Sequence, residues 1–156
     1  MFSSIVLASD GSNHAAKALK VAIDLAKKYE ATLTLVHVLN HDHPSDELVR
    51  MVENEHLDVN PFPTDPEGFD GGHLSTEHST RSMLRSGDKE ARVIYAIGQQ
   101  ILISAKREAE LAGLKNIKME IGSGDYANAI LKVAEMKNAD IIVMGHRGLS
   151  RLKGFV

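Results

Sequence analysis

A short glycine motif follows an apolar run near the end of the chain. Residues 139–148 read Ala-Asp-Ile-Ile-Val-Met-Gly-His-Arg-Gly, so Arg147 stands between Gly145 and Gly148. Four apolar residues without polar alternation favour a strand buried on both faces, as in a parallel sheet. Glycines after such a strand let the backbone approach a ligand and leave N–H groups for an anion, and arginine offers a fork of donors for phosphate oxygens. This layout predicts a nucleotide site; the alternative is a pair of ordinary turn glycines.

A second polar cluster follows the first apolar run of the chain. Residues 5–8 are Ile-Val-Leu-Ala, and Ser9, Asp10, a glycine and Ser12 come next. Such a cluster predicts a turn in which Ser12 caps a following helix. Asp10 stands where this sheet should bind a ligand, and the alternative is an aspartate that closes the turn through its own backbone. A nucleophilic serine would need a base beside it, and the direction of His14 on that helix cannot be read from the sequence. We therefore expect no catalytic residues and no efficient enzyme.

The composition is that of one globular domain spanning residues 1–156. Hydrophobic residues make up 43% of the chain and charged residues 25%, which is ordinary for a folded protein of this length. The net charge of −3 gives no basis for a nucleic-acid or membrane surface. The chain has no cysteine, so disulfides, thiolate metal sites and thiol catalysis are excluded. Neither a basic leader nor an apolar run long enough for a bilayer is present, so we expect a soluble cytoplasmic protein.

The segments that must position the two clusters alternate between strand and helix patterns. Apolar residues recur at helical spacing from the first turn to about Glu30, and a second β-like run covers 33–39. After a long excursion at about 40–88, a second amphipathic helix ends near Gly113, and strand, helix and strand patterns follow. This order predicts an α/β fold with a doubly wound parallel sheet, which binds ligands outside the carboxyl ends of its strands.

Two of the later segments carry finer expectations. Residues 117–121 alternate strictly between apolar and polar side chains, which predicts an edge strand with one face in water. Asp125 follows a glycine and is expected to cap the third helix. The buried side of that helix is predicted to contain Ala127, Ile130, Leu131 and Ala134.

The excursion at 40–88 differs from the rest of the chain in composition. It holds all four prolines and most of the histidines, and segments of this length are usually functional or disordered. Histidines without cysteines in such a segment are more often solvated than metal ligands, so we expect no metal site. A solvated basic face is favoured over a nucleic-acid stripe, because the total charge is negative, for the residues Arg81, Arg85, Lys89 and Arg92.

Taken together, these segments resemble the universal stress protein family. Four motifs carry the resemblance, and they are residues 5–12, residues 35–38 (Leu-Val-His-Val), residues 122–130 (Gly-x-Gly-Asp, ending in Ile) and residues 139–149. ATP-binding members of that family have a Rossmann-like fold, related to the adenine nucleotide α-hydrolases, with strand order 3-2-1-4-5. That order would place the alternating strand at an edge of the sheet.

The resemblance implies an adenine-nucleotide site at the carboxyl ends of the strands. Asp10 would lie near the ribose and phosphates, where its carboxylate accepts a ribose hydroxyl or helps to hold a hydrated Mg²⁺. Val38 would form a wall of the adenine pocket, and the two glycines would bind phosphate. The implied ligand is ATP, with or without Mg²⁺, and the residues implied to line its site are Ala8, Ser9, Asp10, Val38, Met144, Gly145, His146, Arg147 and Gly148.

Part of the family pattern would fall after the last residue of the sequence. The phosphate loop of the family reads Gly-x-x-Gly, nine residues, and then Gly-Ser or Gly-Thr, and nine residues counted from Gly148 run past Val156. The fifth strand, through which family dimers pair, is also absent from this chain. We therefore expect an apparently incomplete C-terminus, an exposed apolar edge on the fourth strand, and a homodimer.

The expected function is the regulatory binding of ATP in a stress response. Two alternatives stay open, a nucleotide-free protein whose sheet serves dimerisation and a slow ATP-hydrolysing or adenylating enzyme. Residues 9–12 are poorer in glycine and serine than the corresponding loop of adenylating relatives, which weakens the last alternative. The change Gly148→Val is expected to weaken ATP binding by about 1–3 kcal/mol, because a side chain would block the approach of the backbone to phosphate.

Overall fold

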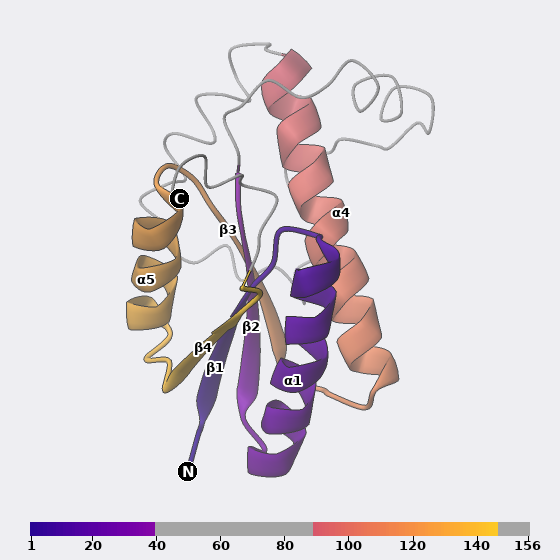
Figure 1. Ribbon diagram of the computed structural model, residues 1–156, viewed down its shortest axis with the longest axis vertical. Coiled ribbons are helices and arrows are strands. Elements are labelled where there is room, and N and C mark those ends of the chain that lie inside the picture. Colours follow the sequence, from indigo (N-terminus) through magenta and orange to yellow (C-terminus); the bar gives the residue numbers. More distant parts are fainter. Residues whose placement is uncertain (40–88, 147–156) are drawn as a thin grey trace.

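The computed structural model describes residues 1–39 and 89–146, which form a four-stranded parallel sheet with helices on both faces (Figure 1). Its elements in chain order are β1 (Ser4–Ala8), α1 (Asn13–Tyr29), β2 (Thr32–Val38), α4 (Lys89–Leu111), β3 (Ile117–Gly122), α5 (Tyr126–Met136) and β4 (Ile141–Met144). The strand order is β3-β2-β1-β4, and each neighbouring pair is parallel. The predicted doubly wound sheet is confirmed, with its first four strands in the order 3-2-1-4.

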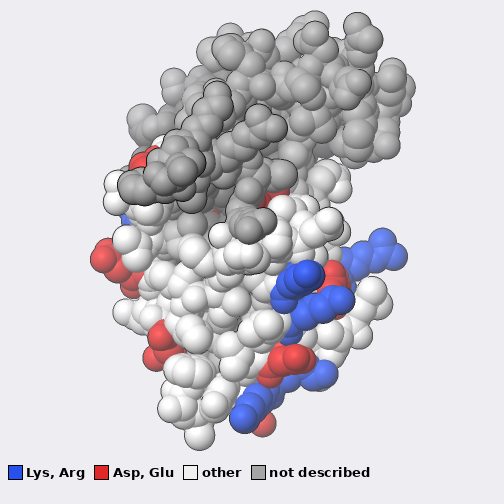
Figure 2. All heavy atoms as spheres, viewed as in Figure 1, with Lys and Arg blue, Asp and Glu red and all other residues white. Residues whose placement is uncertain are grey.

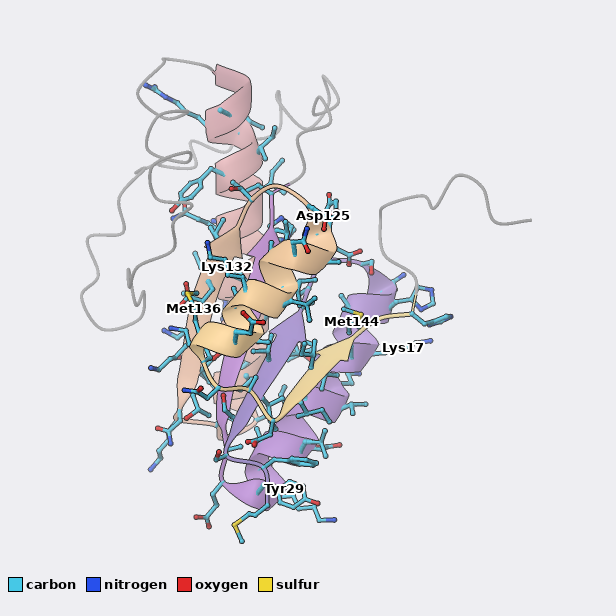
Figure 3. The ribbon with its side chains drawn as sticks, turned by 90° about the vertical axis from the view of Figure 1, so that its left-hand side faces the viewer. Lys17, Tyr29, Asp125, Lys132, Met136 and Met144 are labelled. Atoms are coloured by element: carbon cyan, nitrogen blue, oxygen red, sulfur yellow. The ribbon has the colours of Figure 1, made fainter. Side chains whose placement is uncertain are left out.

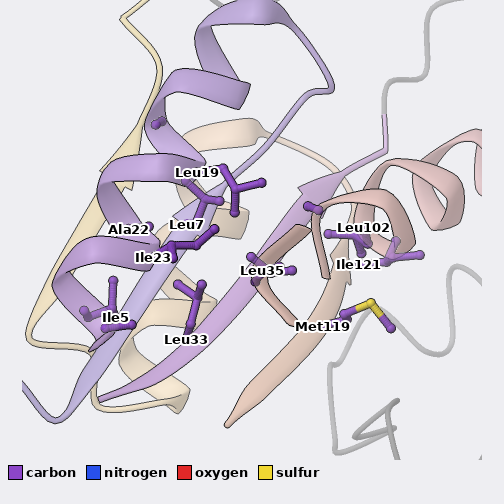
Figure 4. Packing of buried hydrophobic residues seen from close by; sticks show 14 of the residues in the cluster. Ile5, Leu7, Leu19, Ala22, Ile23, Leu33, Leu35, Leu102, Met119 and Ile121 are labelled. Atoms are coloured by element: carbon purple, nitrogen blue, oxygen red, sulfur yellow. The ribbon is translucent and has the colours of Figure 1, made fainter. Parts of the chain in front are cut away.

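The larger hydrophobic core lies between the sheet and the two helices α1 and α4 (Figure 4). Both helices carry apolar residues three and four apart, so each buries one stripe against the sheet. Burial of each large aliphatic side chain contributes about 1.5–3 kcal/mol. The members of this core include Ile5, Leu7, Leu19, Ile23, Leu33, Leu35 and Leu102.

The opposite face of the sheet is covered by α5 and has a smaller core. Val133 and Ala134 of this helix pack there against valines of β1 and β2. The predicted buried side of α5 is wrong at two positions, because Ala127 is exposed and Leu131 is 52% exposed. Helical periodicity gives the spacing of a buried stripe, but the packing of the helix decides its rotation. The predicted residues Ile130 and Ala134 do lie on the buried side, together with Val133.

The strand β3 lies at an edge of the sheet, as predicted, but only part of its polar face is in water. Glu120 is only 2% exposed, and the Nζ atom of Lys137 lies 2.7 Å from its Oε1 atom. Lys137 follows α5, which covers this face of the sheet (Figure 1). The expectation of a wet face is confirmed at Lys118, which is exposed, and wrong at Glu120, which lies in a buried ion pair.

The strand β4 is half-buried, not buried on both faces as its apolar sequence predicted. It pairs with β1 on one side, and no strand of the described part of the chain lies on the other. Its first three residues are partly exposed and Met144 is 54% exposed. The predicted exposed apolar edge is thus observed at this strand.

Two predicted helix caps are confirmed. The Ser12 hydroxyl accepts the Ala15 N–H at 3.2 Å, and the Asp125 carboxylate accepts the Asn128 N–H at 3.0 Å. Each cap satisfies one of the N–H groups that the first turn of a helix leaves unpaired. Figure 3 shows Asp125 at the same end of the fold as Met144, so the N-terminus of α5 lies at the carboxyl edge of the sheet.

The outward side of α1 is polar and carries charges of both signs. Figure 2 shows basic and acidic side chains together on the side of the molecule where this helix lies. The exposed residues of α1 include Lys17, Lys20, Asp24, Lys27 and Lys28. Within residues 1–39 and 89–146, no helix is long and apolar enough to cross a bilayer.

Candidate functional site

The two sequence clusters meet at the carboxyl edge of the sheet. Ala8, the last residue of β1, is in register with Val36 of β2 on one side and with Met144 of β4 on the other. The segments that follow β1 and β4 therefore leave adjacent strands at the same level. This is where the strand order reverses, the usual position of a ligand in a doubly wound sheet.

The turn after β1 is held by its own side chains. The Asp10 carboxylate accepts the Ser12 N–H through Oδ1 at 2.9 Å, and the Ser9 hydroxyl accepts the Gly11 N–H at 3.4 Å. The alternative interpretation of Asp10, that it closes a turn through its own backbone, is thus observed, and its role toward a ligand stays a prediction. These bonds fix the orientation of a half-buried carboxylate at the candidate site.

Gly11 is the residue that lets this turn pass beneath α4. Its φ of +77° lies in the left-handed region, which glycine adopts without strain. A Cβ atom at this position would stand 3.0 Å from Cγ1 of Ile101. The turn is therefore in close contact with α4 as well as with α1, which it caps.

Gly145 brings the segment after β4 against the first turn of α1. A Cβ atom on Gly145 would lie 2.9 Å from the carbonyl carbon of His14 and 3.1 Å from the Ala15 nitrogen. Both of those atoms belong to the backbone, so no rotamer change could relieve the clash. The residue must be glycine for β4 to continue past the N-terminus of α1, where helices present N–H groups to anions.

His146 packs on a residue that the sequence could not place. Its ring meets the ring of His14 edge to face, with centroids 4.5 Å apart and an angle of 84° between the planes. His146 was expected to line the site, and the structure puts it at the carboxyl edge, exposed, beside α1. The direction of His14 is therefore toward the segment after β4, not toward the serines of the turn.

The remaining predicted site residues are divided between this edge and the undescribed part of the chain. Ala8 is half-buried on the α5 face, Val38 is buried at the end of β2, and Met144 is exposed at the tip of β4 (Figure 3). The burial of Val38 makes it part of the core, and its role as an adenine wall stays a prediction. Arg147 and Gly148 lie outside the described residues.

His37 extends from the end of β2 to the turn after β1. Its Nδ1 atom lies 2.8 Å from the Ser9 carbonyl oxygen, so this ring nitrogen has a hydrogen-bond partner. Burial lowers the pKa of His37, although the bond to Ser9 and the charge of Asp10 raise it in part. Sequence reasoning missed the partner of this ring on α4, which is Gly98. A glycine inside a helical pattern was the signal that could have revealed it, because glycine weakens a helix by about 1 kcal/mol.

Metal ligands are sparse in the described residues. Residues 1–39 and 89–146 contain no group of three or more histidine or carboxylate side chains able to hold an ion. Mg²⁺ commonly binds one or two carboxylates together with the phosphates of a nucleotide. Asp10 fits that requirement as a carboxylate at the candidate site. The histidines of the excursion lie outside the described residues, so the expectation about them stays a prediction.

Comparison with known proteins identifies the family. The model of the universal stress protein family matches residues 1–60 and 63–156. The stress response protein NhaX of Bacillus subtilis (strain 168) is 31% identical over 153 residues, covering 97% of this chain and 84% of that protein. The universal stress protein YxiE of the same organism is 30% identical over 153 residues, covering 98% of this chain and 84% of that protein. A solved universal stress protein in complex with cAMP shares the fold, with a TM-score of 0.55 at 18% identity over 97% of this chain and 81% of its own. The chain belongs to the universal stress protein family.

Proposed function

We propose that this protein binds an adenine nucleotide, with ATP as the expected ligand, and that it acts by binding and not by catalysis. The contact of Gly145 with His14 and Ala15 is the observation that carries the proposal. It joins the glycine motif after β4 to the N-terminus of α1 and to the turn that holds Asp10. Backbone N–H groups and one carboxylate thus gather where a phosphate and a ribose would bind.

The fold comparison supports an adenine ligand. One solved universal stress protein with this fold is in complex with cAMP, which contains an adenine base. In the present chain an apolar wall beside the carboxyl edge would be supplied by Val38 and Ala8. Mg²⁺ would enter with the phosphates of ATP, with Asp10 as a carboxylate able to reach it directly or through water.

The serines of the turn act as structural acceptors. The Ser9 hydroxyl accepts the Gly11 N–H, and the Ser12 hydroxyl accepts the Ala15 N–H. An activated nucleophile would in addition donate its proton to an adjacent base, whereas His14, the histidine nearest in sequence, packs on His146. We therefore propose that ATP hydrolysis, where it occurs, is slow and secondary to binding.

Calorimetric titration with ATP, AMP and cAMP, each with and without Mg²⁺, tests the proposal. ATP is expected to bind more tightly than AMP, because the glycine motif binds the additional phosphates. Asp10→Asn keeps an oxygen for the Ser12 N–H but removes the charge, so it should weaken binding mainly when Mg²⁺ is present. Asp140→Asn at the opposite edge of the sheet is the control and should leave affinity unchanged. A wild-type protein that binds none of the three nucleotides would contradict the proposal.

The second candidate function is self-association without a nucleotide. The exposed Met144 side chain and the edge position of β4 among the described strands favour it. In that case Met144→Lys should shift the mass measured by light scattering from dimer toward monomer. A homodimer that binds none of the three nucleotides would favour this second function, whereas a homodimer that binds ATP would favour the first. In either case we propose that the protein works in the cytoplasm.

A further inference from the structure

His37 is a half-buried titratable group whose ring contacts the backbone of the candidate site. It lies at the carboxyl end of β2, and its Nδ1 atom is 2.8 Å from the carbonyl oxygen of Ser9. A carbonyl oxygen can only accept a hydrogen bond, so Nδ1 carries the proton and donates it. The ring therefore holds a backbone group that directly precedes Asp10.

Ser9 makes a second hydrogen bond to β2. The Ser9 N–H donates to the carbonyl oxygen of Val36 at 2.9 Å. Both backbone polar groups of Ser9 are thus bonded to neighbouring residues of β2, one through the main chain and one through the His37 side chain. The attachment of β1 to β2 extends one residue beyond the end of the strand, and the direction in which the chain leaves toward Asp10 is fixed.

The ring of His37 is confined from the other side by α4. A Cβ atom on Gly98 would stand 2.8 Å from Cδ2 and 3.4 Å from Nε2 of the imidazole, and 3.1 Å from a methyl carbon of Leu39. Any larger residue at this position would displace one of the two side chains. Because Ile101, one turn further along the helix, lies over Gly11, α4 confines both the ring and the turn that the ring holds.

We propose that His37 is a positioning residue of the nucleotide site, acting through the Ser9 carbonyl to set the orientation of the Asp10 carboxylate. This inference rests on the proposed function, because it assigns His37 a role in that same site. Burial lowers the pKa of the ring, so the neutral form with its single proton on Nδ1 is the form that acts at neutral pH.

Two substitutions separate positioning from packing. His37→Leu fills much of the ring volume but cannot donate a hydrogen bond, and it is expected to weaken ATP binding by about tenfold. In His37→Asn the amide nitrogen is attached where Nδ1 is attached, so it can donate to Ser9 and should restore most of the affinity. Gly98→Ala leaves His37 chemically intact but displaces its ring, and it should weaken ATP binding as well.

Leu33→Ala is the matched control for a merely structural role. Leu33 is fully buried on β2, on the same face as His37 but near the opposite end of the strand. It should lower the melting temperature more than His37→Leu does, yet leave the affinity for ATP unchanged at a temperature where the protein is folded. Equal losses of affinity in the leucine and asparagine variants, or losses that follow melting temperature across all variants, would overturn the inference.

Nitrogen NMR of the histidine ring gives a readout that does not need a nucleotide. The neutral ring of His37 is expected to carry its proton on Nδ1, and a proton on Nε2 instead would refute the hydrogen bond to Ser9. If the wild-type protein has no affinity for ATP, both the proposed function and this inference are refuted. If the wild type binds ATP and His37→Leu binds it equally well, only this inference is refuted.

Discussion

Each edge of the sheet carries an aspartate close to β1 and β4, Asp140 at the amino edge and Asp10 at the carboxyl edge. The two carboxylates differ in the hydrogen bonds that they accept. At the amino edge, Asp140 accepts the Ser3 N–H at 2.7 Å, the Ser3 hydroxyl at 3.0 Å and the Ser4 N–H at 3.0 Å. At the carboxyl edge, Asp10 accepts the N–H of Ser12, two residues further along the chain. The first carboxylate joins segments that are distant in sequence, whereas the second shapes its own turn.

Further bonds close the amino edge. The Ser4 hydroxyl donates to the Lys137 carbonyl oxygen at 2.9 Å, and the Asp140 N–H donates to the Ser4 carbonyl oxygen at 2.8 Å. Lys137 also reaches the buried Glu120. At the carboxyl edge, the segments that follow β1 and β4 instead meet through the packing of Gly145 on the first turn of α1. The comparison therefore predicts that changes at the amino edge alter stability, and that changes at the carboxyl edge alter ligand affinity.

The largest expected effect on stability is that of Lys137→Met. It removes the cation that lies 2.7 Å from the buried Glu120 carboxylate, and loss of one partner of a buried pair costs about 3–5 kcal/mol of unfolding free energy. Urea denaturation measures this change. Lys106→Met is the control, because its pair with Glu110 is exposed and contributes no more than about 0.5 kcal/mol. Similar losses of unfolding free energy in the two variants would show that the ion pair between Lys137 and Glu120 contributes no more to stability than the pair between Lys106 and Glu110.

Gly145→Val tests the carboxyl edge. The added side chain clashes with the backbone of His14 and Ala15, and relief of such overpacking costs about 1–3 kcal/mol. We expect ATP affinity to fall at least about tenfold, because the segment after β4 is pushed away from the site. The control is Gly113→Ala, whose new methyl group meets no atom within 4 Å although φ is +96°. It should reduce stability through strain and leave affinity unchanged.

Asp140→Asn has a smaller expected effect. The amide keeps one oxygen for the N–H groups of Ser3 and Ser4 but loses the negative charge that strengthens these bonds. Thermal unfolding should show a lower melting temperature, while ATP affinity should match that of the wild type. A drop in affinity without a drop in melting temperature would reverse the proposed contrast between the two edges.

The smallest expected effect is the pH dependence of the difference in melting temperature between the wild type and Asp140→Asn. Hydrogen bonds from Ser3 and Ser4 lower the pKa of Asp140 below its ordinary value of 3.8. A carboxyl group with a lowered pKa in the folded state stabilises the protein above its unfolded pKa and loses this contribution as the pH falls through its folded pKa. The melting temperatures of the wild type and Asp140→Asn should therefore differ at neutral pH and converge in acid. A difference that grows on acidification would contradict the role of the charge.

Local patterns in the sequence predicted the elements and their order. Ser12 and Asp125 cap the helices that their positions indicated, because a cap depends only on neighbouring residues. Predictions that depended on packing were less successful. Leu131 fits a helical stripe equally well in two rotations of α5, and the alternation that includes Glu120 cannot reveal a lysine 17 positions later.

For the candidate site, as for the fold, the sequence predicted which segments lie together but not the contacts between their side chains. Sequence motifs identified Asp10 and Gly145 as neighbours because parallel strands end at a common edge. The contact of His37 with Ser9, and the space that Gly98 leaves for its ring, join residues from three elements. The glycine inside the helical pattern of α4 marks an unusual position, but only the fold shows that His37 fills the space beside it.

Gly98 has a practical consequence for anyone who wishes to make this protein more robust. Replacing helical glycines by alanine is a standard route to higher melting temperature, because it restricts the unfolded chain and favours the helix. In α4 the same replacement would place a methyl group against the imidazole of His37. Thermostabilised variants selected only for heat resistance should therefore be checked for ligand binding whenever this position has changed.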